Sequence, residues 1–269
     1  DGSTQIMAGW GMLASGSDAR GIFVLTSPLQ IPAYSKKTLI VKLDFAPMFF
    51  GDSTGNSVKL KYFGSSGVNM STGEAVKDEA PLDGQITAYV FKSVLRVSAL
   101  PLLTATLQNG TNVLYRVSDA ADAAGDIDVF RKSFQINHSD GLDVRNIRIM
   151  DENFSIAIAP SEIDPAGEIQ FTFDQGKTIA AAKRKTFALM AEISGVKSGS
   201  YVTTEMLGDT IPILNQTVGA FADSGYFGRE NTHLVWSDWS KNPHGLNSQD
   251  WHNGALVYGF PLPQAILSR

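Results

Sequence analysis

The chain contains no cysteine, and this absence is the first exclusion that the sequence makes. Without cysteine there are no disulfides, no thiolate zinc or iron–sulfur sites and no cysteine nucleophile. A secreted protein without cysteine has to rely on packing for its stability. The absence of cysteine suits bacterial or archaeal surface proteins better than small extracellular animal domains. With 269 residues the chain can bury a core large enough to fold without covalent cross-links.

Positive charge and long apolar runs are also scarce. Lys and Arg total 22 against 27 Asp and Glu, a formal net charge of −5, so there is no basic surplus for phosphates and nucleic acid is not an expected partner. No run approaches the roughly 18 apolar residues of a membrane-spanning helix, so we expect no membrane insertion of this segment. The first residues, DGSTQ, lack an initiator Met and do not resemble a signal peptide, which favours a longer polypeptide upstream.

What the sequence does contain is a series of short strand patterns. Runs of β-branched and aromatic residues recur at intervals of roughly 8–12 residues between Gly, Asn, Asp, Ser and Pro clusters, which is typical of an all-β sandwich. The predicted strands are 22–25, 39–45, 58–63, 86–91, 113–117, 127–136, 144–150, 169–173 and 187–193. The best helical window, 179–184, is too short to compete.

An internal repeat organises the chain. The segment PLQIPAYSKKTLIVKLDF matches QGKTIAAAKRKTFALMAEI, and downstream TGNSV (54–58) parallels SGSYV (198–202). In each copy an Ile, a basic pair and a Thr lead into a strand of alternating pattern. Alternation predicts one buried face on each of these strands, formed by Leu39, Val41 and Leu43 in the first copy and by Phe187, Leu189 and Ala191 in the second.

The repeat also predicts the domain organisation. Strand-like sequence from residue 93 to residue 150 precedes the second copy, whereas the first copy stands close to the start of the chain. We therefore predict tandem immunoglobulin-like β-sandwich modules: a partial module at 1–91, a full module at 92–210 and a Trp- and His-rich C-terminal β segment at 211–269. The missing opening strands come from upstream polypeptide, which is the favoured interpretation, or from a neighbouring subunit by β-strand addition.

The C-terminal segment carries a resemblance to known proteins. Together with the repeated unit and the AAGDIDVFRKSFQI stretch, it resembles the C-terminal β-sandwich modules of large uncharacterised secreted surface proteins of candidate-phylum bacteria. The sharpest motif is WSD followed by DWxNG, here Trp236, Ser237, Asp238, Asp250, Trp251, Asn253 and Gly254. The resemblance implies stacked modules at the cell surface that serve in adhesion, a sheath or a filament, and it implies no catalytic residues.

One motif suggests hydrolase chemistry. GDSTG, residues 51–55, formally matches the G-x-S-x-G nucleophile elbow. That motif requires a helix after the Ser, whereas NSVKLKYF follows here and predicts a strand. We therefore do not expect Ser53 to be a nucleophile, and we do not expect the chain to be an enzyme.

Acidic and histidine clusters raise the question of metal binding. A local acidic cluster, Asp119, Asp122, Asp126 and Asp128, is a candidate site for structural calcium, the only cofactor that the sequence suggests. Because EF-hand and nonapeptide patterns are absent, a solvated strand-entry loop is the favoured alternative. The spacing of His233, His244 and His252 fits no zinc motif and favours surface histidines in loops.

Tryptophans and sequons offer candidate contacts with glycans. Trp239 and Trp251 could stack on sugar rings, although core packing is the favoured interpretation and Trp239 is the better candidate for exposure. Five N-x-S/T sequons are candidate N-glycosylation sites, at Asn69, Asn109, Asn137, Asn153 and Asn215. Asn109-Gly110 is also the best candidate for a hairpin turn.

Taken together, these patterns predict an extracellular structural subunit of a cell-surface layer, sheath or pilus-like filament, with strand donation as one means of joining subunits. Its expected partners are copies of itself, other surface-protein modules and glycans. The alternative is a carbohydrate-binding adhesin that uses the C-terminal aromatic residues.

Overall fold

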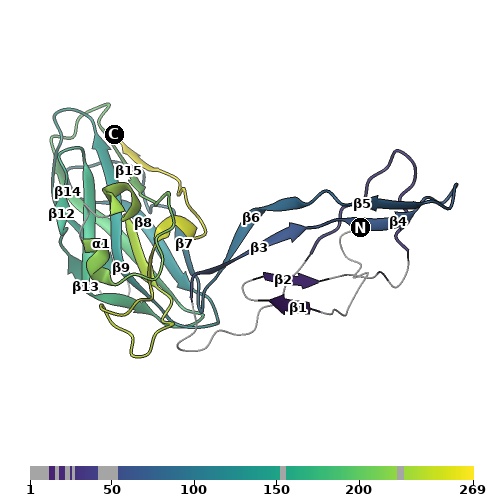
Figure 1. Cartoon of the computed structure of the whole chain (residues 1–269). Coiled ribbons are helices and arrows are strands. Elements are labelled where there is room, and N and C mark those ends of the chain that lie inside the picture. The colour runs from purple at the N-terminus through teal and green to yellow at the C-terminus, as the bar shows by residue number, and fades with distance from the viewer. Residues whose placement is uncertain are drawn as a thin grey trace. The chain divides into compact units, whose positions relative to one another are not determined.

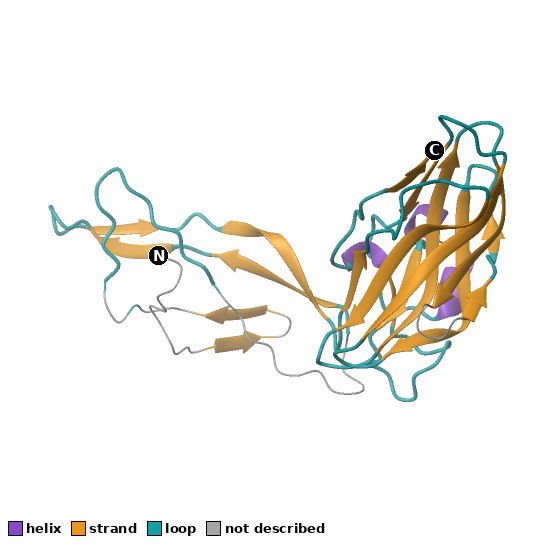
Figure 2. Ribbon diagram, turned by 180° about the vertical axis from the view of Figure 1, so that it is seen from behind, coloured by secondary structure: helices purple, strands orange, loops and turns teal. Residues whose placement is uncertain are grey.

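The computed structural model describes residues 12–15, 18–21, 25, 28–41, 54–151, 156–222 and 227–269. The chain divides into two compact units, residues 1–46 and 47–269. Strands dominate what is described, and the helical turns between them are short (Figures 1 and 2). The prediction of an all-β chain is therefore confirmed. Within these described ranges, no helix combines the length and the apolar character that crossing a membrane requires.

Three antiparallel pairs of strands form two-stranded sheets of their own. In the first unit β1 (Met12–Ser15) pairs with β2 (Asp18–Gly21). In the second unit β3 (Asn56–Tyr62) pairs with β6 (Leu82–Val90), and β4 (Ser65–Val68) pairs with β5 (Ala75–Asp78). Each pair is a two-stranded sheet, so each of its strands keeps one edge outside these ladders.

Two larger antiparallel sheets form a β-sandwich. The five-stranded sheet has the order β11-β10-β14-β8-β7, with β7 at Leu95–Ala99, β8 at Gly110–Ala121, β10 at Asp143–Asp151, β11 at Ile156–Ile158 and β14 at Arg184–Ser194. The seven-stranded sheet has the order β12-β13-β9-β15-β18, with β12 at Glu162–Ile163, β13 at Glu168–Ile179, β9 at Ile127–His138, β15 at Tyr201–Met206 and β18 at Ala265–Ser268.

The C-terminal segment is part of this second sheet. Strand β16 (Leu234–Ser237) pairs with β9 and with β17 (Trp251–Asn253), and β18 pairs with β15. Short helical elements connect these strands, namely α1 (Val218–Ala222), η1 (Arg229–Asn231) and η2 (Gly254–Leu256). The predicted segments 92–210 and 211–269 thus contribute strands to one sheet.

The core lies between the two sheets and is rich in aromatic rings. Phe187 of β14 faces Phe173 of β13 with ring centroids 5.8 Å apart, and Tyr115 of β8 meets Phe134 of β9 at the same separation. Burying one such side chain stabilises the fold by about 1.5–3 kcal/mol. The buried face predicted for the second copy of the repeat is confirmed, because Phe187, Leu189 and Ala191 are at most 1 % exposed.

The repeat recurs in the backbone as well as in the sequence. In the first copy the amide of Ser35 donates to the carbonyl of Pro32 at 3.1 Å, and Tyr34 has a φ of 57°. In the second copy the amide of Lys183 donates to the carbonyl of Ala180 at 2.9 Å, and Ala182 has a φ of 58°. A left-handed conformation is uncommon for residues with a side chain. Its recurrence at equivalent positions indicates that the two turns are structurally equivalent.

After the turn the two copies differ. The second copy continues into β14, whereas the described part of the first, residues 28–41, contains no strand. The buried face predicted there is wrong for Leu39 and Val41, which are 60 % and 54 % exposed, and Leu43 lies outside the described residues. The physical reason is that β14 is buried by neighbours on both sides and by the opposite sheet, whereas no strand flanks residues 39–41 within the described residues.

Candidate functional site

A group of buried ionisable side chains gathers where β16 and β17 meet β9. We call Asp128, Asp238, His244, Asp250 and His252 the polar cluster. Asp238 directly follows β16, Asp250 directly precedes β17, and Asp128 of β9 is paired in register with the last residue of β16. Because β16 pairs with both neighbours, residues far apart in sequence converge at this corner of the sheet.

His244 lies between two carboxylates. Its Nδ1 is 3.0 Å from Oδ2 of Asp250, and its Nε2 is 3.0 Å from Oδ2 of Asp128. Burial alone favours the neutral ring, but hydrogen bonds to Asp128 and Asp250 and their charges together raise the pKa of His244 to about 9. The ring also stacks on Trp239, with centroids 4.5 Å apart. His244 is therefore an imidazolium at neutral pH, and both of its N–H groups donate to a carboxylate.

Asp238 connects the sandwich to the base of the β3–β6 hairpin. Its Oδ2 accepts hydrogen bonds from the hydroxyl of Thr54 and from the amide of Lys92. The Nζ of Lys92 donates in turn to the carbonyl of Trp239 at 2.6 Å, and Nδ2 of Asn215 donates to the carbonyl of Thr54 at 2.8 Å. These contacts join residues just before β3 and just after β6 to the C-terminal segment.

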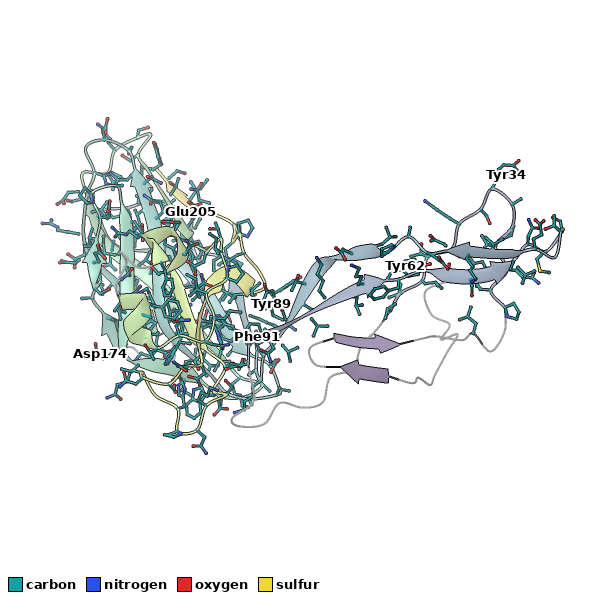
Figure 3. The ribbon with its side chains drawn as sticks, viewed as in Figure 1. Tyr34, Tyr62, Tyr89, Phe91, Asp174 and Glu205 are labelled. Atoms are coloured by element: carbon teal, nitrogen blue, oxygen red, sulfur yellow. The ribbon has the colours of Figure 1, made fainter. Side chains whose placement is uncertain are left out.

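His252 completes the other half of the polar cluster. Its Nδ1 accepts from the amide of Asn215 at 3.3 Å, which leaves the proton on Nε2, 3.6 Å from Oδ1 of Asp238. Burial opposes ionisation of Asp238, yet the adjacent ring of His252 and hydrogen bonds from Thr54 and Lys92 hold its pKa below the ordinary value. Phe91 covers His252 with ring centroids 5.1 Å apart, and Figure 3 marks its position at the end of the hairpin.

The remaining residues of the WSD and DWxNG motif have structural roles. Nδ2 of Asn253 donates to the carbonyls of Ile211 and Asn231, and Oδ1 accepts from the amide of Ile213. Gly254 has no room for a side chain, because an added Cβ would lie 2.8 Å from Cβ of Leu234. The motif thus holds loops against β16 and β17.

The chemistry of the polar cluster favours a structural role. The hydroxyl of Ser248 lies 3.4 Å from Nδ1 of His244, which is close to the arrangement of a nucleophile and its base. A general base has to accept a proton at working pH, whereas both nitrogens of His244 already carry one. The hydroxyl of Ser248 donates instead to Oδ1 of Asp250. The arrangement fixes the loop between β16 and β17.

The four aspartates predicted as a calcium site do not converge. Asp119 contacts Lys132 in the core, and Asp128 belongs to the polar cluster. Asp122 accepts from the amide of Ala124 and the hydroxyl of Ser93, and Asp126 accepts from the amide of Ala181. Within the described part of the chain no group of three or more His, Cys, Asp or Glu could hold a metal. The calcium prediction is corrected, because strand alternation and separate hydrogen bonds direct these carboxylates apart.

The histidines are not surface loop residues, which corrects that interpretation. The side chains of His252, His244 and His233 are 0 %, 7 % and 11 % exposed. Burial lowers the pKa of His233, but the hydrogen bond to Asp209 and the charges of Asp209 and Glu168 more than offset this and raise it. Each histidine is buried because a carboxylate accompanies it, and charge pairing of this kind leaves no signal in sequence spacing.

The two candidate glycan-contact tryptophans lie in different environments. Trp251 is fully buried, packs against Phe130 with centroids 5.8 Å apart, and donates from Nε1 to the carbonyl of Gly245. This burial leaves no face for a sugar ring and agrees with core packing, the favoured interpretation for Trp251. Trp239 is half-buried and has a positive φ of 56°. It is the more exposed member, although His244 stacks on one of its faces.

The sequons also fall in different environments. Asn69 and Asn137 are exposed, Asn69 in a turn where its Oδ1 accepts from the amide of Ser71 and Asn137 within β9. Asn109 is exposed and accepts from the amide of Val196. Asn109-Gly110 begins β8 after a long connection and is not a two-residue hairpin turn, which corrects that prediction. Asn215 uses its Nδ2 in the bond to Thr54, and Asn153 lies outside the described residues.

The hydrolase motif ends at the beginning of a strand. Ser53 lies outside the described residues, and Gly55 adopts a φ of 70° immediately before β3. A strand follows this glycine, as the sequence predicted, where a nucleophile elbow requires a helix.

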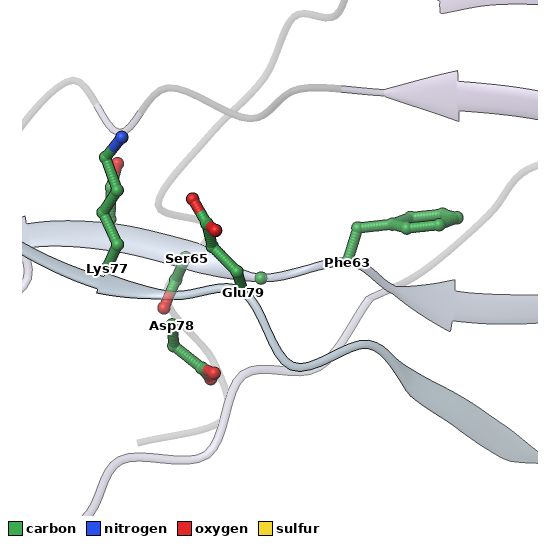
Figure 4. Close-up of a pocket in the computed structure, with 7 residues that line it drawn as sticks. Phe63, Ser65, Lys77, Asp78 and Glu79 are labelled. Atoms are coloured by element: carbon green, nitrogen blue, oxygen red, sulfur yellow. The ribbon is translucent and has the colours of Figure 1, made fainter.

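A hollow lies beside the β4–β5 pair (Figure 4). It is lined by Phe63, Gly64, Ser65, Ser66, Lys77, Asp78 and Glu79. All of these residues except Gly64 are exposed, so the hollow has none of the buried convergent polar groups that fix a small ligand.

Among the described residues, the polar cluster is thus the buried group of charged side chains with the most interconnected contacts. Through Asp238 it also contacts the base of the β3–β6 hairpin. Comparison with protein-family models and with curated proteins finds no match to this chain.

Proposed function

We propose that the chain is a structural subunit of an extracellular cell-surface assembly, such as a surface layer, sheath or pilus-like filament. Its modules are immunoglobulin-like sandwiches in tandem, and β-strand donation between neighbouring subunits is one means by which the subunits are joined. One observation carries the proposal: apolar residues of the N-terminal part are exposed where their equivalents in the repeat are buried in the sandwich.

The comparison between the two copies is direct. Ile31 is 56 % exposed, whereas its equivalent Ile179 is 1 % exposed. Leu39 and Val41 are 60 % and 54 % exposed, whereas their equivalents are core residues of β14. Exposed apolar side chains that align with buried residues of the second copy indicate an interaction surface.

The second half of the repeat also differs between the copies in strand pairing and exposure. Strands β3 and β15 both follow a glycine with positive φ, Gly55 and Gly199. Strand β15 pairs with β9 and β18, whereas β3 pairs with β6 in a two-stranded sheet. Leu60 and Tyr62 of β3 are 43 % and 41 % exposed. An edge strand with exposed apolar side chains is suited to accept a further strand.

The lack of cysteine is compatible with the proposed extracellular setting, because a surface protein without disulfides can rely on packing. Hydrogen bonds from Thr54 and Lys92 to Asp238 connect the β3–β6 hairpin to the sandwich without a disulfide. Asn69 and Asn137 are exposed sequons that a glycoprotein could use.

The proposal is tested by the oligomeric state of the full chain. We expect the wild type to form oligomers or filaments at high concentration, measured by sedimentation and electron microscopy, and Leu60→Asp to abolish them by placing a charge on the apolar face of β3. Leu103→Asp is the matched control, because Leu103 is 86 % exposed in the loop between β7 and β8. A wild-type chain that stays monomeric at every concentration contradicts strand donation between subunits.

The adhesin alternative receives less support. Of its two candidate tryptophans, Trp251 is buried and Trp239 is half-buried against His244. Binding to a glycan array that is lost in Trp239→Ala, from a chain that remains monomeric, would favour the adhesin.

A further inference from the structure

A lysine and an aspartate face each other across the core of the sandwich. Nζ of Lys132 lies 2.8 Å from Oδ1 and 2.7 Å from Oδ2 of Asp119, and both side chains are 0 % exposed. Lys132 belongs to β9 of the seven-stranded sheet, and Asp119 belongs to β8 of the five-stranded sheet (Figure 1). The pair therefore connects the two layers of the fold.

The surroundings of this pair are apolar. Lys132 is flanked in register by Phe171 on β13 and by Leu234 on β16, both fully buried. The ring of Phe187 lies 5.4 Å from Nζ. Lys185, in register with Asp119 on β14, has its ammonium 4.0 Å from Asp151. Such an environment provides little compensation for a buried charge.

The buried environment favours the uncharged forms of both groups. Burial raises the pKa of Asp119, and burial lowers the pKa of Lys132, although each partner opposes the shift of the other. A neutral amine has the lone pair that a nucleophile needs, and a protonated carboxyl has a hydroxyl that can leave as water. Contact of Nζ with both oxygens holds it within reach of the carboxyl carbon, which is the positioning that accelerates an intramolecular reaction.

We propose that Lys132 and Asp119 condense to form an intramolecular isopeptide bond that joins the two sheets. The lone pair of Nζ attacks Cγ of Asp119, and a carbon–nitrogen bond forms. The carbon–oxygen bond to the hydroxyl breaks, and the hydroxyl leaves with one amine proton as water. No electron is transferred, and no cofactor is required.

The bond would cross-link a chain that has no cysteine. It would connect β8 to β9 at a point where the two sheets face each other and would close the connection between residues 119 and 132. A cross-link of this kind restricts the unfolded chain as a disulfide does, but reducing agents do not break it. Its formation requires only the folded sandwich and is independent of how subunits assemble.

Intact-mass spectrometry of the folded full chain tests the proposal. We expect a mass lower than the sequence mass by one water molecule. Trypsin should fail to cleave after Lys132, and the digest should contain one branched peptide that joins the Lys132 and Asp119 peptides. The reaction is measured on the wild type, so the result does not depend on whether a variant folds.

Variants provide the matched controls. Asp119→Ala and Lys132→Arg should have their full sequence masses. Asp119→Asn should lose ammonia in place of water and give a product with the same mass as the cross-linked wild type. A folded wild type that keeps its full sequence mass after prolonged incubation would overturn the proposal and leave Lys132 and Asp119 as a buried ion pair only.

Discussion

At the scale of single residues, the ionisation of His244 should have a measurable effect on how the free energy of unfolding depends on pH. Its pKa is raised from 6.5 to about 9 in the folded protein. A raised pKa stabilises the fold fully below about pH 6.5, and this contribution is lost as the pH rises through about 9. We therefore expect the free energy of unfolding to fall by about 3 kcal/mol between pH 6 and pH 10 through His244 alone, as measured by urea denaturation.

The control for this prediction is His244→Gln, which keeps a polar side chain of similar size but does not titrate. Asp250 and Asp128 remain in this variant, so the change isolates the imidazolium. His233 also has a raised pKa and contributes a slope in the same direction, which the variant retains. An identical pH slope in wild type and variant would contradict the assignment of a charged His244.

At the scale of structural elements, Asp238 decides how firmly the β3–β6 hairpin is held. The fully buried carboxylate accepts hydrogen bonds from Thr54, just before β3, and from Lys92, just after β6. Asp238→Ala leaves these donors without their acceptor and should cost about 3 kcal/mol of unfolding free energy. Hydrogen exchange of β3 and β6 amides should accelerate more than that of β8 and β9. Asp174→Ala, at an exposed carboxylate, should change stability by less than about 0.5 kcal/mol (Figure 3).

At the scale of the whole molecule, assembly should protect the N-terminal part of the chain. Lys36 and Lys37 are exposed beside the repeated turn. We expect trypsin to cleave after them rapidly in the monomer and at least about tenfold more slowly in the assembled form, because cleavage follows the population of the accessible state. The rates are read by mass spectrometry of timed digests. Equal rates in both forms would mean that the assembly surface lies elsewhere.

Much of the sandwich was predictable from local pattern. Alternating apolar residues identified β8, β9, β10, β13 and β14, and the buried face of Phe187, Leu189 and Ala191 is confirmed. The strands extend beyond the predicted runs, because backbone pairing continues past the last apolar residue. Lys132 shows the limit of prediction from sequence pattern. A lysine is expected to be solvated, whereas Asp119 on the opposite sheet offsets part of the cost of burying this one.

The sequence by itself determined the all-β class and the internal repeat, because strand alternation and the repeated residue pattern can be read directly along the chain. Only the tertiary structure decided the polar cluster, the burial of Trp251 and the pairing of Lys132 with Asp119. It also separated the four aspartates that the sequence had grouped. The physical reason is that burial and charge pairing depend on partners up to 184 positions away, as between Thr54 and Asp238. Such partners meet only when the sheets close over the core.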